Sequence, residues 1–279
     1  MAAPGPNTTG QPNTSYYTLG RGKVYFAPLV NSKPGGYREL GNCPEFTMTI
    51  ESEKLEHQSS QGGLKVIDKE VIIATKLNVS FNCDELSFDN QSLFFSGTQV
   101  AAPTNPAIAG FADYNMITDV VKGRWYDIVN AAGVRAYDVE SASVTVQKTP
   151  ATAMVLGTDY LLDLEFGRIF FLTTGIVIVD GDEIDVTLAA DALAKPIYEV
   201  QALTQTNIIG ALKFIGSNAA NNDKMTEYQI HQISLKPEGD FSGISDEFTQ
   251  MGFTGAAESN PTGGGAGSPL MTIRTHDNA

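Results

Sequence analysis

The chain has 279 residues, enough for one large β domain or two of ordinary size, and 42% of them are hydrophobic. Its 18 basic and 32 acidic side chains give a formal net charge of -14. Proteins that hold nucleic acid by its phosphates need the opposite sign, because their affinity comes from Lys and Arg side chains that displace counterions. The charge therefore excludes ordinary DNA binding. It suits a solubilising surface, or a surface past which DNA slides without adhering.

Residues 1–20 are rich in Pro, Gly, Asn, Thr and Ser, and they lack a basic patch followed by an apolar run. We therefore expect a flexible arm and no secretory signal. No stretch approaches the ~18 consecutive apolar residues of a membrane helix, so we expect no membrane insertion. Cys43 and Cys83 show no metal-ligand spacing and are interpreted as buried reduced thiols, which fits assembly in a reducing cytoplasm.

Alternation at period two is the dominant pattern of the sequence. Apolar and polar residues alternate over residues 46–50 and again over residues 77–83. This pattern predicts strands with one buried and one polar face, as in an antiparallel sandwich or barrel. In a further predicted strand the alternation slips near His231 and Gln232, which predicts a bulge. The other strands predicted outside the middle of the chain are 23–28, 199–208, 211–216, 227–236 and 247–254.

One segment predicts a helix, over residues 85–96. Leu86 and Leu93, like Phe88 and Phe95, recur at seven-residue spacing on one broad face. Asp84 is placed to cap its first amides, and a glycine follows its last turn, where a left-handed residue commonly ends a helix. We expect this helix to cover a sheet edge or face.

The middle of the chain has a β pattern of its own between two Ala- and Pro-rich connectors, residues 101–112 and 189–196. Asp180-Gly181 predicts a hairpin turn there. We expect residues 115–197 to form a small inserted β-sandwich, with an elaboration of the main sheet as the alternative. Strands within the insertion are predicted at 123–129, 142–147, 160–164 and 168–172.

The main β domain would then comprise residues 21–114 and 198–256. The glycine-rich residues 257–279 are expected to be a flexible C-terminal arm. The fold class predicted is thus mainly β, an antiparallel β-sandwich or barrel with one α-helix and an inserted small β domain.

No motif in the sequence predicts catalysis. His57, His231 and His276 are far apart and belong to no catalytic pattern. The acidic run from Asp180 to Asp185 lacks the ligand spacing of a calcium loop and is interpreted as a solvated turn. The glycine-rich stretches lack the strand–loop–helix context of a phosphate site. We therefore expect no enzyme activity, no metal and no cofactor.

Trp125 and Tyr126 are interpreted as core packing of the insertion, with an exposed sugar-binding platform as the alternative. The two-domain β pattern together with this pair also allows a different function. That alternative is a β-sandwich adhesin or carbohydrate-binding module of a phage fibre or cell surface.

Residues 53–70 join two well-patterned strands, yet they are far longer than the roughly 2–5 residues of a hairpin loop. A polar, glycine-containing loop of this length is suited to reach a neighbouring subunit. The candidate contact residues are Glu56, His57, Gln58, Ser59, Gly62, Gly63 and Lys65.

Three short motifs follow one another along the chain: GNCPEF at 41–46, EKLEHQS at 53–59, and the ending ISLKPEGDFSGISDEFTQMGFTG from Ile233. A predicted helix follows the strand that returns after the second motif. In this order and spacing the chain resembles the major tail tube proteins of siphovirus-type long-tailed bacteriophages. The resemblance is weakest in the insertion. Each motif is short, so the order carries more weight than any one of them.

The resemblance implies a tail-tube fold and a structural, late virion protein that forms hexameric rings. These rings stack into a tail tube, an acidic channel through which DNA passes without specific binding during genome ejection. The implied partners are copies of the chain itself and the tail tip or baseplate, tape measure and tail terminator proteins. Assembly would take place in the host cytoplasm, with the protein ending in the phage tail.

Glu45, Glu51 and Glu53 are the candidate acids that line the channel. They alternate with apolar residues and so lie on the polar face of their strand. The alternative is that this face is simply an outer, solvated one.

Overall fold

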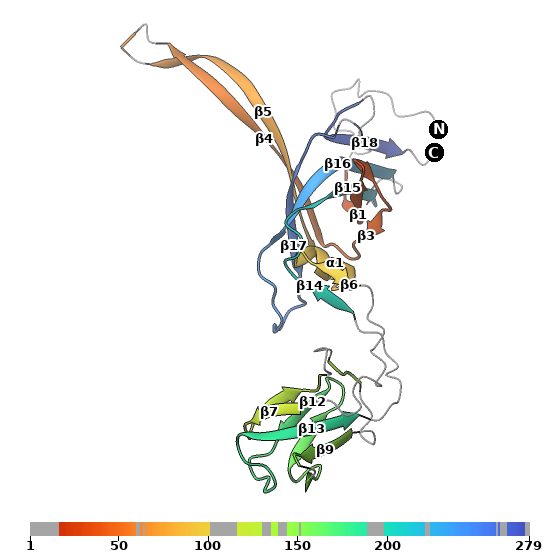
Figure 1. The fold of residues 1–279 in the computed structure, drawn as a ribbon. Coiled ribbons are helices and arrows are strands. Elements are labelled where there is room, and N and C mark those ends of the chain that lie inside the picture. Colours follow the sequence, from red (N-terminus) through yellow and green to blue (C-terminus); the bar gives the residue numbers. More distant parts are fainter. Residues whose placement is uncertain are drawn as a thin grey trace. The chain divides into compact units, whose positions relative to one another are not determined.

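The computed structural model describes residues 17–59, 62–63, 65–100, 116–129, 135–138, 144–150, 152–188, 198–220, 224–260, 262 and 267–276. The chain divides into two compact units (Figure 1). The main unit consists of Met1–Thr98 and Val200–Ala279, and the inserted unit of Gln99–Glu199. The predicted insertion of residues 115–197 falls inside the inserted unit, which begins earlier in the chain than predicted.

Parts of the sequence-based predictions fall outside the described residues. These parts are both connectors, 101–112 and 189–196, and most of the expected arm at 1–20. The last residues of that arm are described and are held by Asn218. Its side chain accepts a hydrogen bond from the Leu19 amide at 3.0 Å and donates one to the Tyr17 carbonyl at 2.9 Å.

The main unit is built from antiparallel strands and one short helix among its described residues. Its elements are β1 (Gly20–Val30), β2 (Lys33–Pro34), β3 (Arg38–Glu39), β4 (Glu45–Ser59), β5 (Val66–Cys83), α1 (Phe88–Phe94), β15 (Ile208–Asn218), β16 (Lys224–Glu238), β17 (Met251–Ala257) and β18 (Met271–His276). The described strands form a nine-stranded sheet in the order β2-β1-β15-β16-β17-β5-β4, with β18 on β16 and β3 on β1. The prediction of a mainly β, antiparallel fold is confirmed.

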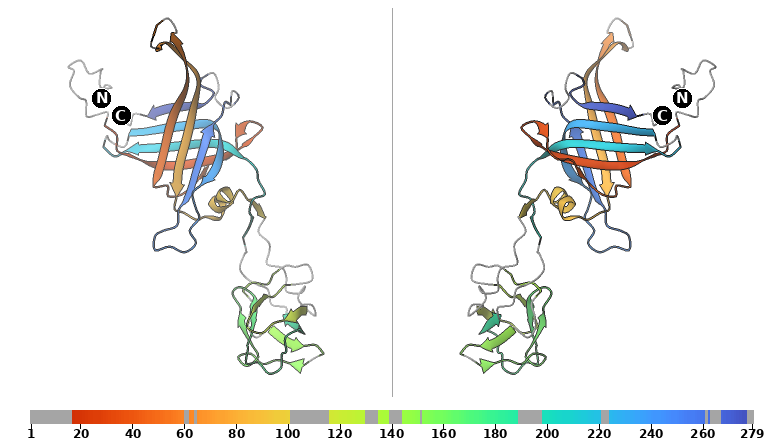
Figure 2. Two further views of the ribbon diagram at one scale, coloured as in Figure 1. Left: turned by 90° about the vertical axis from the view of Figure 1, so that its left-hand side faces the viewer. Right: turned by 90° about the vertical axis from the view of Figure 1, so that its right-hand side faces the viewer.

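The sheet folds over a core that its alternating residues create. In both views of Figure 2, β4 and β5 run across the direction of β1, β15 and β16. Phe46 of β4 stacks on Phe214 of β15 with ring centroids 4.6 Å apart. Phe81 of β5 stacks on Phe253 of β17 at 5.1 Å, and both are almost fully buried. The apolar positions predicted from the alternation over residues 77–83 therefore form the core.

A bulge at His231 and Gln232 makes the corner of the folded sheet. The register between β15 and β16 shifts here, so the predicted bulge is confirmed. Before the bulge the second edge of β16 pairs with β18, and after it the same edge pairs with β17. A bulge bends a strand and increases its twist, which allows one strand to belong to both layers.

The C-terminal stretch 257–279 was predicted to be a flexible arm, and this is wrong for β18. Residues Met271–His276 pair with β16 from Ile230 to Met225. The corner at His231 leaves this half of β16 with an unpaired edge, which β18 fills. A sequence pattern limited to the tail itself could not reveal that edge. β17 likewise begins at Met251, later than the predicted 247.

The helix is shorter than the predicted 85–96 and is capped by different residues. Ser87 caps it by accepting a hydrogen bond from the Asn90 amide, while the predicted cap, Asp84, accepts one from Asn42 at 2.7 Å. Ser96 adopts the left-handed conformation expected of Gly97, with a φ of 47°. Gly97 is needed for space, because a Cβ there would lie 2.5 Å from Val200.

The inserted unit is a small sandwich of two sheets. Its strands are β7 (Met116–Val120), β8 (Trp125–Asp127), β9 (Val144–Lys148), β10 (Thr152–Ala153), β11 (Tyr160–Asp163), β12 (Arg168–Phe171) and β13 (Asp182–Leu188). One sheet has the order β10-β9-β13-β7 and the other the order β11-β12-β8. Ile169 and Phe171 pack with Ile184 and Val186 in a separate core. The strands β6 (Thr98–Val100) and β14 (Glu199–Gln201) pair with each other at the two ends of the insertion.

The predicted hairpin at Asp180-Gly181 is wrong in part. Gly181 does turn with a positive φ of 96°, but residues 172–180 directly before the turn form no strand. The amide of Gly181 donates to the Val120 carbonyl at 2.8 Å, and the Asp182 carboxylate accepts from the Val179 amide at 2.6 Å. The turn thus leads β13 onto β7 instead of back onto residues 176–179.

Candidate functional site

The strands β4 and β5 continue well beyond the sheet that holds their base. They pair from Glu45–Asn82 to Ser59–Val66. β17 accompanies β5 only from Asn78 to Cys83, and within the described residues β4 pairs with β5 alone. Residues 51–59 and 66–76 therefore form a bare two-stranded extension, which we call the projecting ribbon (Figure 1).

The projecting ribbon carries large apolar side chains on both faces. Leu55 and Val71 are cross-strand partners and so share one face, while Ile72 is opposite Lys54 on the other face. Leu55 is 62% exposed and Ile72 is 58% exposed. Other exposed apolar residues of the ribbon are Val66, Ile67 and Ile73. Exposed apolar surface of this extent typically marks an interaction site.

Two irregularities shape the ribbon. The register shifts between Glu53 and Lys54, and again between His57 and Gln58. Each shift places an extra residue in β5, which bends and twists the pair. Such twisting limits non-specific pairing of an exposed edge, so the geometry favours particular partners.

Two ion pairs link the two strands of the ribbon. Lys54 Nζ lies 2.6 Å from Glu70 Oε1, and His57 Nδ1 lies 2.5 Å from Asp68 Oδ1. The hydrogen bond to Glu70 raises the pKa of Lys54 above its ordinary value. Both pairs are solvent-exposed, so they contribute little to stability. They leave the apolar residues as the feature that distinguishes this surface.

The predicted loop at residues 53–70 is therefore wrong as a description of structure. Glu56, His57, Gln58 and Ser59 are strand residues of β4, and Lys65 directly precedes β5. The described glycines Gly62 and Gly63 lie at the tip between the strands. The segment reads as polar because a bare ribbon has no covered face within the chain. The apolar run Val71–Ala74 was the signal that could have revealed it.

The three predicted channel acids lie in line on one face of β4. Glu45, Glu51 and Glu53 are exposed, and the opposite face carries the partly buried Phe46 and Met48. Asn82 of β5 donates to Glu45 Oε2 at 3.1 Å, and Lys76 is the cross-strand partner of Glu51. The pairing register places short polar side chains on the same face, which we call the polar face: Thr47, Thr49, Asn78, Ser80, Asn82 and Thr254.

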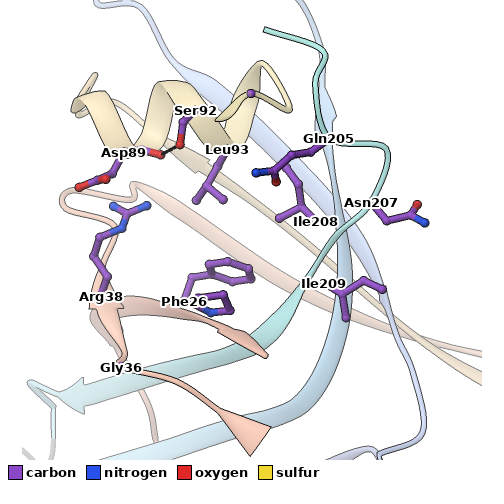
Figure 3. A pocket seen from close by; sticks show the side chains of 12 residues that line it. Phe26, Gly36, Arg38, Asp89, Ser92, Leu93, Gln205, Asn207, Ile208 and Ile209 are labelled. Carbon is purple, nitrogen blue, oxygen red and sulfur yellow. Dashed lines mark hydrogen bonds between the residues drawn. The ribbon is translucent and has the colours of Figure 1, made fainter. Parts of the chain in front are cut away.

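A pocket of about 410 Å³ lies beside α1 in the main unit. Its lining is apolar at Phe26, Leu93 and Ile208, and Arg38 and Asp89 are charged groups beside it (Figure 3). Arg38 Nη1 donates to Asn90 Oδ1 at 2.7 Å, and burial lowers the pKa of the guanidinium. The pocket is large enough to accommodate an apolar side chain.

The three histidines lie on three different strands of the main unit, β4, β16 and β18. His57 is on the ribbon, and His231 is buried at the sheet corner with Nε2 2.9 Å from Thr272 Oγ1. Among the described residues no group of three or more His, Cys, Asp or Glu side chains is arranged to hold a metal ion. The described part of the chain also contains no helix with the length and apolar character needed to cross a membrane.

Comparison with known proteins gives a family but no function. The chain belongs to the family described as protein of unknown function UCP028589, whose model matches residues 17–274. That match includes the inserted unit and most of the main unit, and it ends within β18. A search of curated proteins finds no match to the chain.

Proposed function

We propose that this chain is a structural subunit that polymerises into a hollow tube, as stacked hexameric rings of a phage tail. The tube would conduct DNA into the host during ejection, and the role requires no catalysis. The single observation that carries the proposal is the projecting ribbon, with exposed apolar side chains on both faces. The order of motifs that resembles tail tube proteins adds the specific assembly.

The ribbon supports the proposal of assembly, because among the described residues no third strand or covering layer packs against it. An isolated two-stranded hairpin is marginally stable at best in water, and a third strand or a covering surface is needed. Leu55, Val71 and Ile72 leave apolar surface on both of its faces. A second copy of the chain packed on the ribbon would remove that surface from water.

The free edge of β4 supports a repeating contact. Within the described residues this edge has no strand partner, so its backbone N–H and C=O groups are available for pairing along a neighbouring strand. A contact between two different surfaces of identical subunits produces a ring when its rotation closes. The ribbon and the β4 edge of one subunit would contact a different part of the sheet on the next subunit. This is the head-to-tail arrangement that a ring requires.

The polar face supports the role of a channel wall. Its Ser, Thr and Asn side chains are short, and Glu45, Glu51 and Glu53 add negative charge in a chain of net charge -14. Such a surface offers no excess of Lys and Arg to displace counterions from DNA. Replacing all three acids by Gln is expected to slow or stall DNA ejection while tubes still assemble. Normal ejection from such particles would contradict the assignment of these acids to the channel wall.

Negative-stain electron microscopy of the concentrated, long-incubated protein tests assembly. We expect hollow rings or tubes from the unaltered chain and from Ile176→Ser, which changes an 88% exposed residue of the inserted unit. Leu55→Ser combined with Val71→Ser is expected to leave only single particles. Tubes that form equally well from this double variant would contradict the role given to the ribbon.

The remaining partners follow from the same proposal. A tail tube subunit would also contact tail tip or baseplate, tape measure and tail terminator proteins, and would reside in the virion. Removal of residues 101–198 offers a check on the inserted unit, because β6 and β14 pair at its two ends. Tubes should still form without these residues if the unit only decorates the assembly.

A further inference from the structure

Trp125 lies on the outer face of the inserted unit, contrary to its interpretation as core. It is 47% exposed, whereas its neighbour Tyr126 is partly buried and its ring packs on Phe171. The Tyr126 hydroxyl accepts a hydrogen bond from the Val121 amide at 2.8 Å. Adjacent residues of a strand point to opposite faces, so only one of the two could join the core.

The outer face of the β11-β12-β8 sheet carries an apolar row. Phe170 of β12 is the cross-strand partner of both Trp125 and Leu161, so the three residues share this face. The rings of Trp125 and Phe170 are tilted by 45° with centroids 5.2 Å apart. Leu161 is 41% exposed, so the row is open to solvent at both ends.

A second, charged row runs beside the first. Arg168 is the cross-strand partner of Asp127 and of Asp163. Its Nε donates to Asp163 Oδ2 at 3.2 Å, and its guanidinium carbon lies 5.2 Å from the ring centroids of both Trp125 and Phe166. The hydrogen bond from Arg168 lowers the pKa of Asp163, which therefore remains a carboxylate at neutral pH.

The charges of this surface cancel in pairs. Arg168 pairs with Asp163, and Arg135 Nη2 lies 2.9 Å from Asp127 Oδ1. Arg135 is held further by the bond from its Nε to the Phe166 carbonyl at 2.9 Å. The outer face of the β11-β12-β8 sheet with its charged row, which we call the platform, thus carries two positive and two negative groups, and its net charge is close to zero. The platform therefore has no net positive charge to attract a strongly anionic ligand, such as nucleic acid or an anionic membrane.

We propose that this surface, which includes Trp125, binds a neutral glycan. A sugar ring has an apolar C–H face that stacks on an aromatic ring, and hydroxyl groups at its edge that bond to planar charged side chains. The aromatic row and the adjoining Asp and Arg row offer both groups side by side. The fixed ion pairs hold these side chains in place before binding, which reduces the entropy lost on binding. This activity is separate from the proposed assembly through the ribbon.

The test uses the intact chain and its single tryptophan, whose fluorescence reports on this site alone. The chain is first applied to an array of neutral hexose and N-acetylhexosamine oligosaccharides. It is then titrated with maltohexaose, cellohexaose and chitohexaose while Trp125 emission is recorded. We expect array signals and a saturable change in emission with one of these sugars, and no change with dextran sulfate.

Variants distinguish the platform from general stickiness. Trp125→Ala is expected to weaken array binding roughly tenfold or more, and Trp125→Phe to weaken it less, because a ring is retained. Ile176→Ala is the matched control, since it shortens an 88% exposed residue of the same unit, and it should bind as the unaltered chain does. Circular dichroism checks that each variant is folded.

Two results would overturn the proposal. One is an array on which the unaltered chain gives no more signal than folded Trp125→Ala. The other is a shift of Trp125 emission that depends on protein concentration and not on sugar, which would mean that another copy of the chain covers the platform. Neither result tests the ribbon as the contact that assembles the tube, so the two proposals fail independently.

Discussion

The strands β4 and β5 pass from a packed base into the projecting ribbon. Their apolar side chains are buried at the base and exposed to solvent on the ribbon. At the base, Val79 and Phe81 are each 1% exposed. Farther out, Leu55 and Ile72 are 62% and 58% exposed, although both stretches are paired strands. The comparison teaches that pairing and alternation establish a strand, while a covered face needs a second layer. Among the described residues that layer is present only at the base.

The largest expected effect separates the two regions by stability. Phe81→Ala removes a ring packed on Phe253 and should lower the free energy of unfolding of the main unit by about 3–5 kcal/mol. Leu55→Ala on the ribbon should change it by no more than about 0.5 kcal/mol, because Leu55 is already exposed. Native-state hydrogen exchange of β5 and β17 is the measurement, since Trp125 fluorescence reports on the inserted unit. Similar losses of unfolding free energy for both variants would contradict the distinction between a packed base and an uncovered ribbon.

A polar contact of the base should give the next largest effect. Asn90 is buried, and its Nδ2 donates to the carbonyls of Leu40 at 2.8 Å and Glu85 at 2.9 Å. Its Oδ1 also accepts from Arg38. Asn90→Ala leaves these groups without their partner and should destabilise the main unit by about 1–3 kcal/mol. Gln91→Ala, next to it on α1, removes only an exposed bond and should have little effect on the same exchange measurement.

Acid should loosen the sheet corner but not the base of the ribbon. Burial, and to a smaller degree Arg274, lowers the pKa of His231 below its ordinary value of 6.5, because the folded chain disfavours the charged ring. The unfolded chain therefore binds more protons as the pH falls below 6.5, and stability present above that pH is lost. Hydrogen exchange of β18, corrected for its intrinsic pH dependence, should rise in this range. His231→Gln should remove the pH dependence; an unchanged profile in that variant would contradict this assignment.

The smallest expected effect compares two ion pairs. Lys213 Nζ lies 2.9 Å from Glu227 Oε1 and 4.5 Å from the Tyr37 ring centroid, with side chains only 23% and 18% exposed for the charged pair. Lys213→Ala should lower the free energy of unfolding by about 1 kcal/mol. Lys54→Ala, which removes the exposed pair on the ribbon, should give no measurable change. Urea denaturation followed by circular dichroism would show whether the two values differ in this order.

Sequence alone predicted the parts of the fold that depend on local alternation. The core positions over 77–83 and the bulge near His231 were predicted because period two, and a break in it, are visible within one segment. The ribbon and β18 were missed, since each depends on a partner distant in the chain. Polar residues and Gly62 and Gly63 made the ribbon resemble a loop.

The candidate site was predicted only in part for a related reason. Alternation placed Glu45, Glu51 and Glu53 on one face, and the structure has them there. It could not indicate that Leu55 and Val71 would remain uncovered, because burial is set by the layer above a strand. Trp125 and Tyr126 show the same limit, since two adjacent aromatic residues do not reveal which one faces the core.

Hydrogen exchange of the ribbon before and after assembly tests the central claim most directly. Peptides covering residues 51–59 and 66–76 would be compared between dilute protein and sedimented assemblies, with β12 of the inserted unit as the internal control. If the ribbon is the contact between subunits, its exchange should slow by roughly tenfold or more on assembly while that of β12 stays the same. Tubes in which the ribbon exchanges as fast as in the dilute protein would contradict the claim.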